Sequence, residues 1–135
     1  MPGLEIREGK NVPVRALLGL LGGEEWAAGR TGRDLARCLE RTTLLLTGWR
    51  RGRCVAMVRV LSDGVYRALL DDLVVHPSGR GRGWGRALLE AALAHPLVRD
   101  VEEVALFTSI PGFYRRWGFR RDPQAMKLRR GPRRG

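Results

Sequence analysis

Apolar residues occur in short blocks along the chain, and their spacing predicts alternating strands and helices. Residues 4–7 form a short strand-like segment, and residues 14–21 form an apolar, helix-compatible stretch that Gly22 and Gly23 end. Within residues 34–41, Leu35 and Leu39 are four positions apart, which predicts a second helix with one apolar face.

The second half of the chain predicts three consecutive strands and then a further alternation. Residues 43–49 and 53–61 are apolar or β-branched runs separated by a turn, which is typical of a hairpin. Residues 66–76 form a longer strand that Pro77 ends. The remaining expected elements are a helix from Trp84 to Pro96, a strand over 101–108, a short helix over 111–117 capped by Gly118, and a last edge strand over 126–128.

This order (strand, two helices, three-stranded meander, helix, strand, helix, strand) contains no internal repeat and predicts an α/β sheet covered by helices. A chain of 135 residues is long enough for one domain with one core. We assign residues 1–130 to that domain and 131–135 to a basic, flexible tail. No apolar run reaches membrane-spanning length, and the N-terminus lacks the features of a secretory signal, so we expect a cytoplasmic protein without a membrane partner.

The net charge of +11 comes almost entirely from arginine, since Lys10 and Lys127 are the only lysines. Such a charge favours polyanionic partners, either a multiply phosphorylated cofactor or nucleic acid. Cys38 and Cys54 have no metal-ligand spacing around them, so we expect free thiols in a reducing compartment and no metal site.

A glycine- and arginine-rich turn over residues 79–86 lies between the strand 66–76 and the following helix. Unpaired backbone N–H groups at a helix N-terminus suit a phosphate or pyrophosphate, although a plain connecting turn has the same composition. The turn lacks the Gly-Lys-Ser/Thr ending of a P-loop, and no glycine register in it completes a dinucleotide fingerprint.

A different motif does match the turn. Residues 80–85, Arg-Gly-Arg-Gly-Trp-Gly, fit the pattern R/Q-x-x-G-x-G/A, and residues 113–119, Phe-Tyr-Arg-Arg-Trp-Gly-Phe, fit Phe-Tyr-x-x-x-Gly-Phe. In this order and spacing the two motifs resemble the GNAT superfamily of N-acetyltransferases, and the resemblance extends over residues 4–128. It implies a mixed, mostly antiparallel central sheet flanked by helices, with acetyl-CoA as co-substrate.

The resemblance also implies how the co-substrate is held. The strands 66–76 and 101–108 splay apart, and the pantetheine amides pair with the backbone of Leu73, Val74 and Val75 in the gap. The residues expected around the pyrophosphate are Arg80, Gly81, Arg82, Gly83, Trp84, Gly85 and Arg86. Many relatives carry an asparagine where this chain has Phe107, and Ser109 is the candidate substitute.

Tyr114 is implied as the general acid that protonates the leaving thiolate, with a half-buried core aromatic as the alternative role. Asp71 and Asp72 resemble the acidic pair of diamine and polyamine acetyltransferases, which points to Asp71 as the base and Asp72 as the fallback. Structural salt bridges to arginine are the alternative for both. Because neighbouring strand residues face opposite ways, we expect at most one of the two to point at the acetyl group.

The function predicted is acetyl transfer from acetyl-CoA to a primary amine by direct attack in a ternary complex. No cysteine adjoins either motif, so no covalent intermediate is expected. Trp26 and Gly29 are candidates for the acceptor-site wall, and His76 and His95 are expected to be boundary residues. A basic nucleic-acid-binding protein and a CoA-binding protein without catalysis are the alternatives, while the acceptor amine and homodimerisation are left open.

Overall fold

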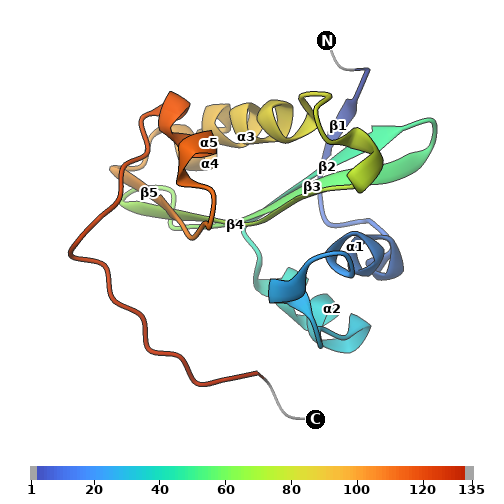
Figure 1. Cartoon of the computed structure of the whole chain (residues 1–135), viewed down its shortest axis with the longest axis horizontal. Helices are drawn as coiled ribbons and strands as arrows, with labels where there is room; N and C mark the ends of the chain where they lie inside the picture. The colour runs from blue at the N-terminus through green and yellow to red at the C-terminus, as the bar shows by residue number, and fades with distance from the viewer. Residues whose placement is uncertain (1–2, 133–135) are drawn as a thin grey trace.

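A computed structural model describes residues 3–132 of the chain. Its centre is one five-stranded sheet in the order β1-β2-β3-β4-β5 (Figure 1). The strands are β1 (Glu5–Glu8), β2 (Leu44–Arg50), β3 (Arg53–Ser62), β4 (Arg67–Val75) and β5 (Glu103–Leu106). All neighbouring pairs are antiparallel except β4 and β5, which are parallel, so the expected mixed and mostly antiparallel sheet is confirmed.

Helices cover both faces of the sheet, giving three layers (Figure 1). The helices on one face are α1 (Val14–Leu21), the 3-10 turn η1 (Glu25–Ala27) and α2 (Gly32–Arg41). The other face carries η2 (Pro77–Gly79), α3 (Trp84–Ala94), α4 (Pro96–Arg99), α5 (Pro111–Tyr114) and η3 (Arg115–Trp117). Among residues 3–132, no helix is long and apolar enough to cross a membrane.

Each face has its own apolar cluster, because inward side chains of the central strands alternate between the two layers. Leu45 and Met57 pack with Leu17 on the α1–α2 side. Val58 and Leu70 pack with Leu88 on the α3 side. The sheet is therefore rigidly held at β3 and β4, the strands next to the candidate site.

The expected last strand over residues 126–128 is wrong. No strand is assigned after β5 in the part of the chain that the structure describes, and Met126 and Leu128 are 94% and 78% exposed. Only two apolar residues alternate in this segment before a run of arginine, so it can bury too little apolar area to hold a strand in place. β5 is consequently an edge strand.

β4 and β5 diverge after a short paired stretch. The last paired residues are Leu70 and Leu106, and β4 continues to Val75 without a β5 partner. The expected splay is therefore present, and it leaves the β5-facing backbone groups of residues 71–75 without a strand partner.

A β-bulge interrupts β4 at the start of this unpaired stretch. Met57 pairs with Val74 and Arg59 with Asp71, so Asp72 and Leu73 together oppose Val58. Asp72 has a positive φ of 52°, which a non-glycine residue rarely adopts. The expectation that Asp71 and Asp72 face opposite ways is wrong, because the bulge breaks the alternation and both carboxylates contact Arg59.

Candidate functional site

The glycine turn presents the N-terminus of α3 to solvent. Gly83 is the residue before the helix and has a φ of +81°, a conformation that favours glycine. No side chain caps this end of α3, and its first turn contains no acidic residue. The first-turn N–H groups of Gly85 and Arg86 have no acceptor four residues earlier in the helix, so this end can receive an anion.

Gly79 packs directly against the ring of Trp84, the first residue of α3. A Cβ atom at this position would lie 1.9 Å from Cε3 of the Trp84 ring, and that ring is almost completely buried. Only glycine therefore allows the turn to pack on the start of α3. Gly79, the first glycine of the turn, was not among the residues predicted to contact the pyrophosphate, and its role is to let the turn pack against Trp84.

The charged residues of the turn differ in their contacts. Arg80 forms an ion pair with Glu24 at 3.6 Å, and Arg86 forms one with Glu90 at 3.5 Å. The Arg82 guanidinium lies 5.8 Å from the centre of the Trp84 ring. Gly81 lies in the same exposed turn, so the predicted loop residues are contiguous around the start of α3.

The predicted pantetheine track lies on the unpaired stretch of β4. Leu73 and Val75 face the α3 side, and Val74 is buried on the α1–α2 side. Gly85 also approaches this stretch, since a Cβ on it would lie 3.5 Å from Val75 Cγ2. The splayed strand and the glycine turn thus form one continuous surface.

Tyr114 ends α5, whose Phe113 ring lies close to Gly85 of the glycine turn. The Tyr114 ring packs edge-on against Phe113, with centroids 4.9 Å apart, and against Phe119 at 5.9 Å. Burial raises the pKa of the Tyr114 phenol above its ordinary value of 10.0. The phenol therefore remains protonated at neutral pH, as a proton donor must. Phe113 and Trp117 supply part of the apolar contact, as expected.

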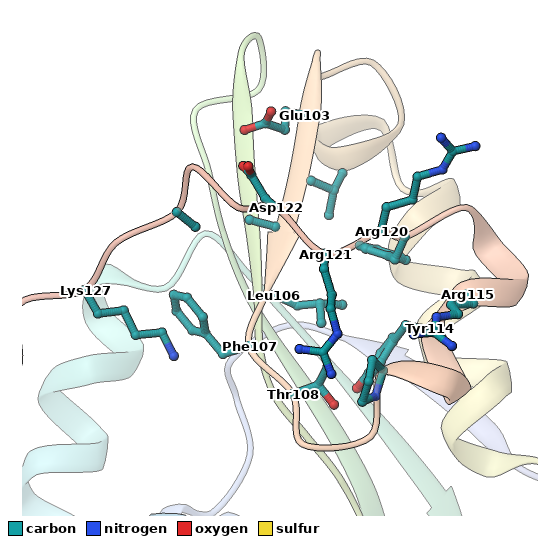
Figure 2. A pocket seen from close by; sticks show the side chains of 15 residues that line it. Glu103, Leu106, Phe107, Thr108, Tyr114, Arg115, Arg120, Arg121, Asp122 and Lys127 are labelled. Carbon is teal, nitrogen blue, oxygen red and sulfur yellow. The ribbon is translucent and has the colours of Figure 1, made fainter.

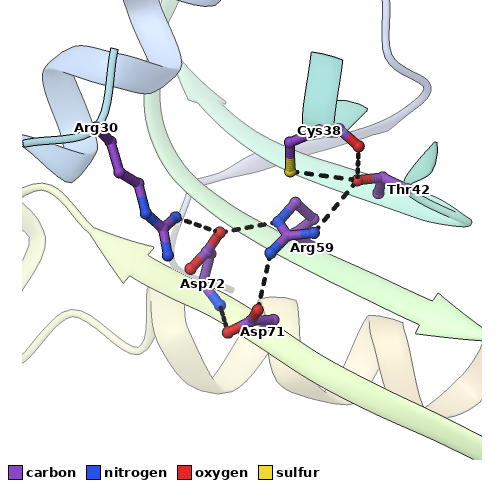
Figure 3. Close-up of polar contacts among 6 residues, drawn as sticks. All are labelled: Arg30, Cys38, Thr42, Arg59, Asp71 and Asp72. Atoms are coloured by element: carbon purple, nitrogen blue, oxygen red, sulfur yellow. Dashed lines mark hydrogen bonds and ion pairs between the residues drawn. The ribbon is translucent and has the colours of Figure 1, made fainter. Parts of the chain in front are cut away.

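Asp71 and Asp72 belong to an ion-pair cluster on the α1–α2 side of the bulge (Figure 3). Asp72 Oδ2 accepts hydrogen bonds from Arg59 Nε and from Arg30 Nη1, each at 2.8 Å, and its side chain has no exposed area. Asp72 Oδ1 is buried without a partner. Asp71 Oδ2 accepts from Arg59 Nη2 at 2.8 Å, and the Asp71 side chain is 35% exposed.

Arg59 is the centre of this cluster and was missed in the sequence. Burial by itself would lower the pKa of Arg59, but the hydrogen bond that Arg59 donates to Asp72 and the charges of both aspartates outweigh it, so the net shift in pKa is upward. A lone arginine between Val58 and Val60 in an apolar strand was the available signal, since an unpaired buried cation is costly.

Arg30 connects the cluster to the segment between α1 and α2. Its guanidinium binds Asp72 and lies 5.3 Å from the centre of the Trp26 ring, which is half exposed. Arg30 thus links the segment that carries Trp26 and Gly29, the candidate acceptor-wall residues, to β4, while both of these residues remain exposed.

A cavity of about 620 Å³ lies along the free edge of β5 and reaches Tyr114 (Figure 2). Its walls are β5, α5 and the segment 119–127 that crosses the edge of the sheet. Phe107 and Thr108 line it, so the position that departs from the family pattern borders this space. Ser109 lies in the exposed link between β5 and α5, outside the residues that line the cavity.

The two histidines cap short helices. The Nδ1 atom of His76 accepts from the Ser78 N–H at 3.1 Å, and that of His95 accepts from the Leu97 N–H at 3.1 Å. Their expected role as boundary residues is confirmed. Cys38 and Cys54 are half-buried free cysteines.

Comparisons with known proteins agree with this geometry. The family model of the acetyltransferase (GNAT) domain matches residues 41–121. Over 110 residues, 75% of this chain, the sequence is 36% identical to GCN5-related N-acetyltransferase 1, chloroplastic, of Arabidopsis thaliana. Over 78 residues, 56% of this chain, it is 42% identical to Serotonin N-acetyltransferase 2, chloroplastic, of Oryza sativa subsp. japonica.

The chain spans 55% and 39% of the lengths of these two plant proteins. Among solved structures, a GNAT-family acetyltransferase from Xanthomonas campestris is 30% identical, with a TM-score of 0.83 over 95% of this chain and 94% of its own. An acetyltransferase from Clostridium acetobutylicum, solved with acetyl-CoA, is 13% identical and has a TM-score of 0.72 over 93% of this chain and 96% of its own, which shows a shared fold. With these matches the chain belongs to the GNAT family of acetyltransferases.

Proposed function

We propose that this protein transfers the acetyl group of acetyl-CoA to a primary amine by direct attack in a ternary complex. The single observation that carries the proposal is the divergence of β4 from β5 after Leu70 and Leu106. This divergence leaves a strand-shaped track with an anion-accepting helix end beside it, and Tyr114 lines the cavity along β5, the other diverging strand.

The chain's residues fit acetyl-CoA in order along this track. The first-turn amides of α3 and the exposed arginines of the turn, Arg80 and Arg82, would hold the pyrophosphate. The unpaired backbone of Leu73, Val74 and Val75 would hold the pantetheine as an added strand does. When bound, acetyl-CoA supplies the thioester whose acetyl group is transferred.

Proton transfer is assigned to two residues on opposite sides of the sheet. Asp71 lies on the α1–α2 side and is proposed to accept the proton of the incoming ammonium, directly or through water. Tyr114 lies on the α3 side and is proposed to donate its proton to the thiolate as the carbon–sulfur bond breaks. The new bond joins the amine nitrogen to the acetyl carbon, and the products are an amide and CoA thiol.

Of the two aspartates, Asp71 is the better candidate for the base. Asp72 is the less suitable base because its side chain has no exposed area and is bound by two arginines. Asp71 keeps about a third of its side chain exposed, so it is the carboxylate that water or an amine can reach.

The test is release of CoA thiol from acetyl-CoA across a panel of amines, with the acetylated product identified by mass. We expect turnover with at least one primary amine and loss of most of it in Asp71→Asn. Tight acetyl-CoA binding without turnover on any amine would instead favour a binding protein that has lost catalysis.

A further inference from the structure

The charged side chains that line the cavity along β5 indicate which kind of amine could accept the acetyl group. Its lining includes four cations, Arg115, Arg120, Arg121 and Lys127, and two carboxylates, Glu103 and Asp122. Among residues 3–132, none of these four cations forms an ion pair with an acidic side chain. Glu103 is 3.8 Å from Arg67, and Asp122 Oδ1 accepts from the Gln124 N–H at 2.8 Å.

The cations that line the cavity point in different directions: Arg121 extends toward the end where transfer is proposed, Lys127 toward Phe107, and Arg120 away from both (Figure 2). Figure 2 shows the Arg121 side chain extending from the C-terminal segment toward Thr108 and Tyr114. The Lys127 ammonium lies 3.9 Å from the centre of the Phe107 ring. Cations gathered around one space repel each other, and an anion bound there would relieve this repulsion.

The acidic groups near the transfer site are already neutralised. Asp71 and Asp72 could have attracted a polycationic amine, but Arg59 binds both carboxylates and Arg30 also binds that of Asp72 (Figure 3). The β5 cavity beside Tyr114 is lined by four cations and two carboxylates, so the net charge available to an acceptor there is positive. This distribution disfavours a di- or polyamine.

From these observations we infer that the cavity along β5 is the acceptor site and that the acceptor is an amine that also carries a carboxylate or phosphate group. The inference rests on the proposed acetyltransferase function. A volume of about 620 Å³ lies in the range of small-molecule sites, so a small acceptor fits better than a folded protein. Arg121 binds the anionic group, and the amine extends from the cavity to the point where β4 and β5 part, so that it reaches the acetyl group between Tyr114 and Asp71.

The test uses amines of one length that differ in the terminal group: 5-aminopentanoate, pentylamine and cadaverine. O-phosphoethanolamine and ethanolamine form a second pair. Comparing the gain in kcat/KM between the two pairs shows whether the site prefers a phosphate or a carboxylate. We expect kcat/KM to be about tenfold higher for the anionic member of a pair than for the neutral one, since the contact is charge-assisted. Cadaverine should be the poorest of the five-carbon amines.

Arg121→Gln should reduce the anionic-to-neutral ratio of kcat/KM several-fold, and Arg121→Lys should retain most of it. Arg15→Gln is the matched control, because Arg15 is exposed on α1, does not line the cavity and changes the net charge equally. If Arg121→Gln unfolds, Lys127→Gln gives the same measurement on the other wall.

Two results would overturn the inference while leaving the acetyltransferase function intact. One is turnover in which neutral or cationic amines equal or exceed the anionic ones. The other is an Arg121→Gln variant that raises the KM for acetyl-CoA but keeps the ratio, which would assign the cations to the co-substrate. If no amine of the series is acetylated, the result counts against the proposed acetyltransferase function itself.

Discussion

At the scale of single residues, Tyr114 combines a packing role with the proposed chemical one. Its ring contacts Phe113 and Phe119, and burial raises the pKa of its phenol. These roles are compatible, because the apolar packing that holds the ring also favours the neutral phenol. The same desolvation that anchors Tyr114 therefore keeps its proton available for transfer.

Tyr114→Phe retains the packing and removes the donor. We expect kcat to fall by about 10²-fold or more, with little change in acetyl-CoA affinity. The wild-type rate should fall only above pH 10, because Tyr114 must be protonated and its pKa is raised. This alkaline fall should be absent in the variant. A kcat within a few-fold of wild type would remove Tyr114 as the general acid.

The site residues that could be predicted lie in local sequence motifs. Those that were missed depend on contacts with residues far away in the chain. The glycine turn and Tyr114 lie in continuous motifs, so spacing alone located them. Arg59, Arg30 and Arg121 act through partners distant in the chain, and no local pattern distinguishes them from the many other arginines. Whether the predicted residues bind and catalyse as assigned stays a prediction.

At the scale of elements, the β-bulge in β4 could not be predicted from the alternation of apolar and polar residues. Alternation places Asp71 and Asp72 on opposite faces, whereas the bulge puts both at Arg59. The positive φ of Asp72 has an energetic cost, and the buried ion pairs with Arg59 and Arg30 compensate for it.

Asp72→Asn tests this account, since asparagine tolerates the same backbone conformation but lacks the charge. Two guanidinium groups would lose their buried partner, and we expect a loss of about 3 to 5 kcal/mol in the free energy of unfolding in urea. Glu5→Gln is the control, because it breaks an exposed pair with Arg7 and should cost far less. Equal effects of the two substitutions would contradict the structural role of Asp72.

The glycine turn gives a second element-scale prediction. Gly79→Ala would place a methyl group 1.9 Å from Trp84, so the turn must shift. We expect a loss of roughly 1 to 3 kcal/mol in the free energy of unfolding, together with weaker acetyl-CoA binding. Gly19→Ala in α1 meets no atom within 4 Å and should be neutral or slightly stabilising. Normal acetyl-CoA affinity in Gly79→Ala would show that the turn tolerates displacement.

Most elements were predictable within one to three residues because each has an apolar block and a clear turn signal. The strand expected over 126–128 failed because a three-residue pattern carries no information about whether a partner strand will hold it. β5 also proved shorter than expected, ending at Leu106 rather than Thr108. Edges of a sheet depend on tertiary contacts that local patterns do not encode.

At the scale of the whole molecule, the charge of +11 is distributed in two different ways. Some arginines are paired inside the fold, as Arg59 and Arg30 are, while others gather around the β5 cavity without acidic partners among the described residues. The arginines at 129, 130, 133 and 134, two just before the predicted tail and two within it, form a third group that we call the tail arginines, of which 133 and 134 lie outside the described residues. The predicted tail over 131–135, a cytoplasmic location and homodimerisation stay predictions.

Replacing the four tail arginines by glutamine lowers the net charge from +11 to +7 and separates the acetyltransferase from the nucleic-acid hypothesis. If the positive charge serves acetyl-CoA, the variant should bind acetyl-CoA within about twofold of wild type, because the anion-accepting turn lies at α3.

Gly83→Glu is the complementary change. It puts a carboxylate at the helix end and strains a φ of +81°, so acetyl-CoA binding should be lost while the tail is untouched. A nucleic-acid-binding protein would give the reverse: salt-sensitive DNA or RNA affinity that falls in the tail variant and survives Gly83→Glu. Titrating both ligands against both variants at two salt concentrations decides between these outcomes, since each hypothesis predicts loss in a different variant.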